Sequence, residues 1–386
     1  MKRSIDRILT THAGSLPRPE GLQSLLQARQ IGEDFDQEDL RESVSSSVDE
    51  VVRIQSQVGI DIVSDGEQSK SNFFAYVQER LLGIEPAGEV PPMNSSPDFP
   101  GFQDWWAGHH RIAGSALLRR PECVGPLAWK NKEQLDSDIE NLKHALSTVQ
   151  VEEAFLPAAS VGIIAQRIPN RYYTTYEQYV EAIANVMKEE YQAIARADLV
   201  VQIDAPEMCI DRNHPPFRDK PIVEFRKQME LWVEALNYAL TGINEEQVRF
   251  HICWGNGERP HTEDVPLEEI IDVIFKVHAG AYSVEAANPR HAHEWKLWEK
   301  LKLPDGKVLI PGVIDSTTNF VEHPELVAQR VICYANLLGR ENVIAGTDCG
   351  FGTTAFANSI FPPVAWAKLG ALVEGSRLAS ESLWPQ

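Results

Sequence analysis

A His and a Cys stand two positions apart at the end of an apolar run, at His251 and Cys253 in HICWGNG. On a strand, residues i and i+2 point to the same face, so both side chains would aim at one side of a sheet. Glu285 lies 32 residues beyond Cys253, and Cys349 lies 64 residues beyond Glu285. A βα repeat takes roughly 30 residues or more, so these intervals correspond to one repeat and two repeats. We therefore expect the four side chains to meet where the fifth, sixth and eighth strands end.

This set of side chains has the chemistry of a zinc site. Two thiolates, an imidazole and a carboxylate are all ligands that Zn²⁺ accepts. The competing interpretation is a buried core His with two unreactive Cys, which an isolated H-x-C motif would favour, but the match to the repeat length favours zinc. Three other Cys residues are interpreted as packing residues without a ligand role: Cys123, Cys209 and Cys333. His291 and His293 follow the sixth expected strand and are interpreted as residues at the start of a helix, also without a ligand role.

The elements that must position these residues are eight short apolar runs. Helix-period segments such as residues 175–197 and 323–339 lie between them. Strand alternating with helix eight times predicts an α/β fold, a (β/α)8 TIM barrel. A doubly wound sheet is the alternative, although WGNGERP lacks the later Gly of a dinucleotide-binding turn. The expected strands are residues 7–15, 59–67, 151–160, 197–206, 248–255, 281–287, 307–316 and 341–350.

One long stretch departs from the repeat. Residues 85–110 are rich in Pro, Gly and Ser and are too long for an ordinary connection. They predict an inserted excursion over about residues 85–130, a hairpin or lid between strands two and three. The rest of residues 1–386 is expected to form a single barrel domain.

Composition excludes several function classes. Lys and Arg total 36 against 56 Asp and Glu, which gives a net charge of −20 and a field that repels nucleic acid and anionic membranes. No stretch approaches the roughly 18 apolar residues of a spanning helix. The five Cys are scattered and odd in number, which argues against a disulfide framework. We expect a cytoplasmic protein with reduced thiols.

Six segments, in this order, carry a family resemblance: TTHAGSLPRP, SDGEQSKSNFFAYV, VQIDAP, HICWG, VEAANPRH and GTDCGFGT. From about residue 8 to residue 360 the chain resembles the catalytic barrel of the cobalamin-independent methionine synthase family. The resemblance implies a zinc-dependent (β/α)8 enzyme that transfers a methyl or other alkyl group to a thiol. It implies His251, Cys253, Glu285 and Cys349 as zinc ligands, the same four that the spacing selects.

The resemblance also implies a site for the amino acid part of homocysteine. The matching positions are Gly14 and Ser15 in HAGS, Glu67 in SDGEQ and Asp204 in VQIDAP. The Gly-Ser turn would offer N–H groups to a carboxylate, and the two acids would form charge-assisted bonds to an ammonium group. For the two acids alone, a strand-end cap or a loop ion pair is the competing interpretation.

Two departures from the family pattern concern the alkyl donor. Nothing before residue 7 could replace the additional N-terminal barrel that helps hold polyglutamated folate in full-length members. The family's catalytic His follows an Asp in the seventh-strand loop, but here Asp315 is followed by Ser316. Asp315 and His323 are the catalytic candidates that remain. We therefore expect poor turnover with the folate and a small methyl donor or a corrinoid protein in its place.

Three rival functions stay open from the sequence. An alkyltransferase that uses another thiol, such as coenzyme M in epoxide opening, would need cations where Glu67 and Asp204 stand. A zinc hydrolase would need a stronger Lewis acid than a site with two thiolates. A structural zinc protein would close the site with four ligands. Partners are expected to be a small-molecule thiol and an alkyl donor, and a homo-oligomer is left open.

Overall fold

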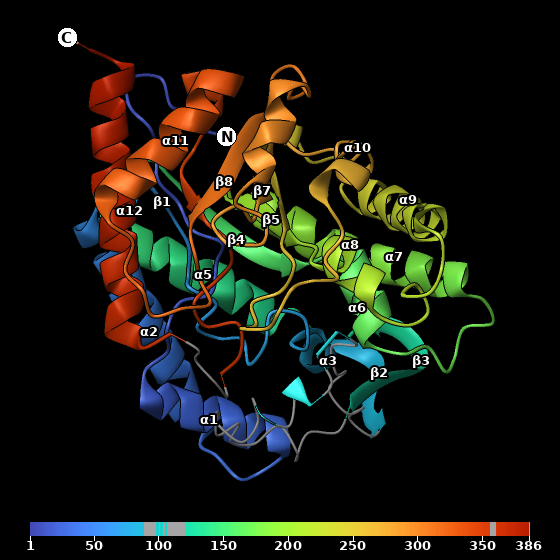
Figure 1. Cartoon of the computed structure of the whole chain (residues 1–386). Coiled ribbons are helices and arrows are strands. Elements are labelled where there is room, and N and C mark those ends of the chain that lie inside the picture. The colour runs from blue at the N-terminus through green and yellow to red at the C-terminus, as the bar shows by residue number, and fades with distance from the viewer. Residues whose placement is uncertain (89–97, 100, 103–104, 106–119, 356–359, 386) are drawn as a thin grey trace.

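The core of the protein is a curled parallel sheet of seven strands with helices outside it (Figure 1). The computed structural model describes residues 1–88, 98–99, 101–102, 105, 120–355 and 360–385. The strand order follows the chain, which confirms the predicted TIM-barrel class. In that order the strands are β1 (Ile62–Val63), β4 (Glu153–Ala159), β5 (Val200–Asp204), β6 (Val248–Ile252), β7 (Ala281–Val284), β8 (Val308–Ile314) and β9 (Gly346–Thr347).

The N-terminal segment occupies the place of the first expected strand, residues 7–15, without being a regular strand. Thr10 forms a parallel bridge with Ala345, and the Ala345 N–H donates to Leu9 O at 2.9 Å. On its other side, the Ile62 N–H donates to Thr10 O at 3.0 Å. The Thr10 N–H is taken by the Asp61 carboxylate at 2.8 Å, so a side chain replaces a ladder bond. The segment thereby spans the gap between β9 and β1.

The helices pack their apolar faces on the outside of this sheet. The predicted helices 175–197 and 323–339 are present as α7 (Tyr176–Arg196) and α11 (Pro324–Leu338). A capping box of Thr175 and Gln178 begins α7, and Gly339 follows α11. The other helices are α1 (Glu20–Ile31), α2 (Gln37–Val58), α3 (Val77–Arg80), α5 (Glu133–Leu146), α6 (Val161–Arg167), α8 (Glu207–Ile210), α9 (Ile222–Ala239), α10 (Ile271–Ile274) and α12 (Pro362–Leu383). Short 3-10 turns are Asp211–Asn213, Glu245–Gln247, Leu267–Glu269, Glu294–Glu299 and Arg340–Asn342.

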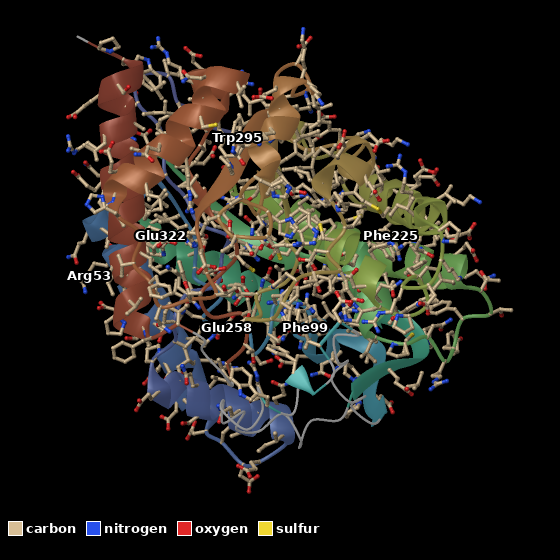
Figure 2. The ribbon with its side chains drawn as sticks, in the orientation of Figure 1. Arg53, Phe99, Phe225, Glu258, Trp295 and Glu322 are labelled. Atoms are coloured by element: carbon tan, nitrogen blue, oxygen red, sulfur yellow. The ribbon has the colours of Figure 1, made fainter. Side chains whose placement is uncertain are left out.

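Burial on both faces explains the continuous apolar runs of the strands. Every residue of β5 and β6 is buried, as expected for a parallel sheet covered by helices. Figure 2 shows side chains filling the space between sheet and helices, with Phe225 among them and Arg53 at the outer edge of α2. In the described part of the chain, no helix combines the length and the apolar character that a membrane span requires.

The inserted segment begins and ends as an antiparallel hairpin between β1 and β4. Its strands are β2 (Leu81–Gly88) and β3 (Arg120–Trp129), as the fold prediction required. Residues 89–97 and 106–119 of the predicted excursion lie outside the described residues. The Trp129 indole donates to Val186 O at 3.0 Å, which fastens the hairpin to α7.

A buried ionic group joins the base of this hairpin to the helix layer. Arg80, at the end of α3, donates to Asp138 of α5 and lies 3.3 Å from Glu190 of α7. The Tyr76 hydroxyl donates to Glu190 at 2.5 Å. The Arg80, Asp138 and Glu190 side chains are each 4% exposed or less, so each charge depends on the others.

We expect Asp138→Ala to lower the free energy of unfolding by about 3 kcal/mol, because it leaves a buried guanidinium short of one partner. Urea denaturation measures the change. The control is Glu50→Ala, which removes an exposed ion pair to Arg53 and should change stability by less than about 1 kcal/mol. Equal, small effects in both variants would contradict the assigned role of the buried group.

Candidate active site

A cavity of about 210 Å³ opens at the carboxyl ends of the strands. Six of the ten predicted site residues line it: Ser15, Glu67, Asp204, His251, Cys253 and Cys349. The apolar part of the wall is formed by Ala13, Phe73, Phe74, Ile163, Pro206 and Ile210, and the rest by Arg167, Gly255, Asn256, Gly350 and Thr353. The cavity therefore brings thiols, an imidazole, two carboxylates and aromatic rings to one place.

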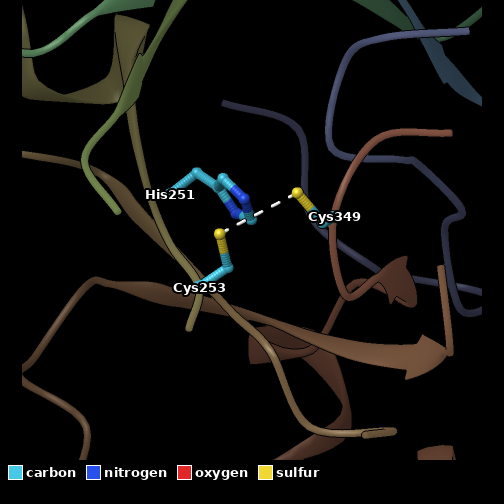
Figure 3. Close-up of side chains that lie close together, drawn as sticks. All are labelled: His251, Cys253 and Cys349. Atoms are coloured by element: carbon cyan, nitrogen blue, oxygen red, sulfur yellow. Dashed lines mark hydrogen bonds between the residues drawn. The ribbon is translucent and has the colours of Figure 1, made fainter. Parts of the chain in front are cut away.

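His251, Cys253 and Cys349 converge in this cavity (Figure 3). His251 lies on β6, Cys253 follows it, and Cys349 follows β9. Their ligand atoms all lie within 4.8 Å of one another, and the two sulfurs are 3.8 Å apart. Two sulfurs that each lie about 2.3 Å from a tetrahedral zinc are separated by about 3.8 Å, so the spacing fits that ion.

The His251 side chain is oriented so that one ring nitrogen could bind a metal ion. Its Nδ1 lies 3.2 Å from Ser283 Oγ, while its buried Nε2 has no hydrogen-bond partner in the described structure. Burial and the charge of Arg249 lower the pKa of His251 to about 3, which keeps the ring neutral with a lone pair for a metal. A buried nitrogen without a hydrogen-bond partner costs free energy unless it coordinates a cation, which the two nearby sulfurs could also bind. These residues fit a zinc ion.

Without such a cation, the Cys349 thiol is difficult to ionise. The Cys253 sulfur at hydrogen-bond distance raises the pKa of Cys349 well above its ordinary value, and burial raises it further. The Glu285 carboxylate acts in the same direction. A bound cation reverses this balance, because it stabilises the thiolate form of a coordinated Cys.

Glu285, the fourth predicted ligand, follows β7 but is outside this group of three. Its Oε2 accepts the Trp254 N–H at 2.7 Å and its Oε1 accepts the Asn288 side-chain amide at 2.8 Å. Both hydrogen bonds fix the carboxylate next to the residue that follows Cys253. A ligand role for Glu285 stays a prediction.

Glu67 and Asp204 form an acidic pair in the cavity wall. Burial, and then the negative charge of Glu67, raise the pKa of Asp204 well above 3.8. Burial also raises the pKa of Glu67, while the charges of Lys70 and Arg18 oppose this shift. Glu67 Oε2 is buried and has no hydrogen-bond partner within the part of the chain that the structure describes. Among the described residues, no cation is hydrogen-bonded to either carboxylate, and an ammonium group would supply such a partner.

The Gly14–Ser15 turn lies against this acidic pair. Gly14 has φ +129°, and a Cβ there would approach Glu67 Oε1 to 2.8 Å. Within the described residues, the Ser15 N–H donates no hydrogen bond. Its carbonyl accepts the Phe351 N–H at 2.8 Å, which ties the turn to the loop of Cys349. A free N–H in the cavity wall can bind a carboxylate.

The two predicted catalytic residues do not line the cavity. Both Asp315 oxygens are taken by the backbone and hydroxyl groups of Thr317 and Thr318, at 2.5 to 3.0 Å. Although burial opposes it, these bonds lower the pKa of Asp315. His323 is exposed, and its Nδ1 caps α11 by accepting the Glu325 N–H at 3.2 Å. Catalytic roles for Asp315 and His323 remain predictions.

Sequence reasoning missed a second group, His261, Asp264 and His291, whose ligand-type atoms also lie within 4.8 Å of one another. Burial alone would lower the pKa of His291, but hydrogen bonds to Asp264 and Glu294 outweigh it and raise the pKa to about 9. The interpretation of His291 as a helix-start residue therefore missed a buried imidazole that is hydrogen-bonded to two carboxylates. The available signal was the three-residue spacing of His261 from Asp264 and of His291 from Glu294.

We expect Asp204→Asn to stabilise the metal-free protein at pH 8 by about 1 to 3 kcal/mol. Because the pKa of Asp204 is raised on folding, the native state retains a proton that the unfolded chain releases near pH 3.8, and stability falls as pH rises through this window. The Asn side chain does not titrate, so the free energy of unfolding of the variant should exceed that of the wild type only slightly at pH 4 and by more toward pH 8. Urea unfolding across this range measures it. A difference in unfolding free energy that stays constant with pH would contradict the raised pKa of Asp204.

Comparisons with known proteins place these features in context. The family model for "Cobalamin-independent synthase, Catalytic domain" matches residues 8–94. A methionine synthase from Sulfolobus acidocaldarius is 24% identical, over 99% of this chain and 95% of its own. One from Thermococcus kodakarensis is 24% identical, over 97% and 94%.

Solved structures agree in fold. A B12-independent methionine synthase from Shewanella sp. W3-18-1, in complex with selenomethionine, has a TM-score of 0.75 at 21% identity and covers 98% of this chain and 100% of its own. A methyltransferase from Methanosarcina mazei has a TM-score of 0.52 at 11% identity, with 97% and 94% covered. These matches, which cover nearly the whole of each chain, show that this chain shares their fold.

Proposed function

We propose that this chain is a member of the cobalamin-independent methionine synthase family and that it transfers a methyl group to the thiol of homocysteine at a zinc ion. The observation that carries the proposal is a shared cavity. It holds two Cys sulfurs 3.8 Å apart, an unpaired His251 nitrogen and an unpaired Glu67 oxygen. The two sulfurs and the His251 nitrogen are suited to a metal cation, and the Glu67 oxygen is suited to an ammonium group.

The chain's own residues divide the work along this cavity. When bound, zinc would be held by His251, Cys253 and Cys349, with Glu285 as the fourth candidate, and would lower the pKa of an incoming thiol. Glu67 and Asp204 bind the ammonium group of the amino acid, and the Ser15 N–H binds its carboxylate. Holding the amino acid at these points orients its sulfur toward the metal ligands and removes much of the entropy cost of meeting the donor.

The same contacts argue against the rival functions. A sulfonate-bearing thiol such as coenzyme M would place an anion beside Glu67 and Asp204. A structural zinc site is closed by its ligands, whereas here the three ligand side chains line an open cavity. A hydrolase would use a metal with weaker donors than two thiolates. Reduced Cys ligands also favour a reducing compartment, and we place the protein in the cytoplasm.

The choice of methyl donor depends on whether the site can supply a proton to the leaving group. A folate leaves as an amine and needs a proton from a positioned acid. The Asp315 carboxylate is occupied and its pKa is lowered, and His323 caps a helix on the surface. We therefore propose a donor whose leaving group needs no proton from these residues, either a small methyl donor or a methylated corrinoid protein.

We expect the reconstituted protein to hold about one zinc per chain, as a site with this ligand set should. Cys349→Ser should lose most of that metal. The control is Cys333→Ser on α11, which removes a thiol outside the cavity and should leave zinc content unchanged. Atomic absorption measures the metal. Wild-type zinc below about a tenth of an equivalent after reconstitution would end the proposal.

We expect Glu67→Gln and Asp204→Asn each to weaken homocysteine binding by about 1.5 to 3 kcal/mol, because each removes a charge that faces the ammonium group. Zinc content should stay unchanged. Glu207→Gln is the matched control, since Glu207 is buried next to the lining residue Pro206 but does not line the cavity. Calorimetric titration measures affinity. Tighter binding of 2-mercaptoethanesulfonate than of homocysteine would support the coenzyme M alternative instead.

A further inference from the structure

A second group of buried polar side chains lies beside the active site, in the loops after β6 and β7. His261 Nδ1 lies 2.6 Å from Asp264 Oδ2, and His291 Nε2 lies 3.0 Å from the same oxygen. His291 Nδ1 lies 3.2 Å from Glu294 Oε2. We call these four residues the imidazole–carboxylate cluster. Its side chains are all 12% exposed or less.

Although its atoms are close enough to bind a metal, the cluster is already satisfied by its own hydrogen bonds. His261 Nε2 lies 3.0 Å from Gly257 O, so each ring nitrogen of both His residues has a partner. The other Asp264 oxygen accepts from Asn213 and the other Glu294 oxygen from the Leu267 N–H. His251 differs, because its Nε2 has no partner. The cluster is therefore a hydrogen-bonded network that holds two loops together.

This network reaches the metal-binding residues through Trp254. The His291 ring stacks on the Trp254 ring with centroids 3.8 Å apart and an interplanar angle of 20°. Trp254 directly follows Cys253, and its backbone N–H donates to Glu285 Oε2 at 2.7 Å. Its indole N–H donates to Val265 O at 2.8 Å, within the cluster's own loop. The position of Trp254 thus depends on both loops.

A second connection runs through Asn288. The His291 N–H donates to Asn288 O at 2.9 Å, and the Asn288 side chain donates to Glu285 Oε1 at 2.8 Å. Both Glu285 oxygens are therefore bound by groups that His291 contacts. Asp264 holds the outer side of the His291 ring and limits its rotation.

We propose that the imidazole–carboxylate cluster is a positioning device that orients Glu285 and Cys253 through Trp254 and Asn288. Asp264 and His291 are positioning residues, because neither lines the cavity. The inference deepens the proposed function and rests on it for its metal-dependent consequence. Groups that orient metal ligands typically change metal affinity by about 10- to 100-fold when removed.

The test compares Asp264→Asn and His291→Gln with wild type in two measurements. The first is amide hydrogen exchange of Trp254 in the metal-free protein, which needs no metal. We expect the Trp254 N–H to exchange at least about tenfold faster in both variants, because the stacked His291 ring that holds Trp254 beside Glu285 is removed or loses its Asp264 carboxylate partner. The second is the visible spectrum and chelator-induced release of Co²⁺ bound in place of zinc. We expect shifted d–d bands and at least about tenfold faster release.

Asp138→Asn is the control for general destabilisation, because it disturbs a buried ion pair between α3 and α5 away from these loops. It should lower the melting temperature and leave both measurements unchanged. Wild-type exchange at Trp254 in both variants would overturn the inference, and so would an unchanged Co²⁺ spectrum and release rate. A wild-type protein that binds neither Zn²⁺ nor Co²⁺ would overturn the proposed function instead. Faster Trp254 exchange would then still support the positioning of Glu285.

Discussion

Buried acidity without its cations is the constraint on which this site depends. Glu67, Asp204 and Cys349 line one cavity, and Glu285 lies beside it. Burial raises the pKa of each of these carboxyl groups, and the neighbouring Cys253 sulfur together with burial raises the pKa of the Cys349 thiol. Desolvation of a carboxylate or thiolate costs several kcal/mol unless an opposite charge compensates it. The cavity is therefore complementary to a metal cation at one set of residues and to an ammonium group at another.

The neighbouring Arg and Lys side chains do not pair directly with these acids, because their N–H groups donate to backbone and hydroxyl oxygens. Arg18 donates to Gly352 O and Glu67 O, both backbone atoms, and Arg249 donates to Thr11 Oγ1 and His12 O. Lys70 donates to Pro157 O and lies 4.4 Å from the Tyr76 ring centroid. These groups lower the electrostatic cost of the acids from a distance and fix the strand ends, yet leave Glu67 Oε2 without a partner. Preorganised charge of this kind binds a ligand without reorganising when it arrives.

The sequence predicted those features that follow from a repeat, and missed those that depend on loop conformation. Apolar runs and their 32- and 64-residue intervals were sufficient to place His251, Cys253 and Cys349 at one rim. The same spacing brought Glu285 to the rim but could not show that its oxygens face Trp254 and Asn288. β1 and β9 are only two residues long, and the segment between them donates its Thr10 and Ala13 N–H groups to the side chains of Asp61 and Thr347. Periodicity does not reveal such bonds. The contact of His291 with Asp264 joins two irregular loops, so no period predicts it.

The loop after β8 is held in place by hydrogen bonds of its own polar side chains. The family resemblance would place a His in the run Ser316 to Thr318. There, Ser316 Oγ donates to Asn256 Oδ1 at 2.9 Å, and the Asn256 amide donates to Gly350 O at 2.6 Å. This chain of bonds links the loops after β6, β8 and β9, next to Cys253 and Cys349. Asp315 shapes the same loop by accepting four bonds from Thr317 and Thr318. Because all four of these bonds go to the Asp315 carboxylate, this loop supports the proposed donor, one whose departing group needs no proton from Asp315.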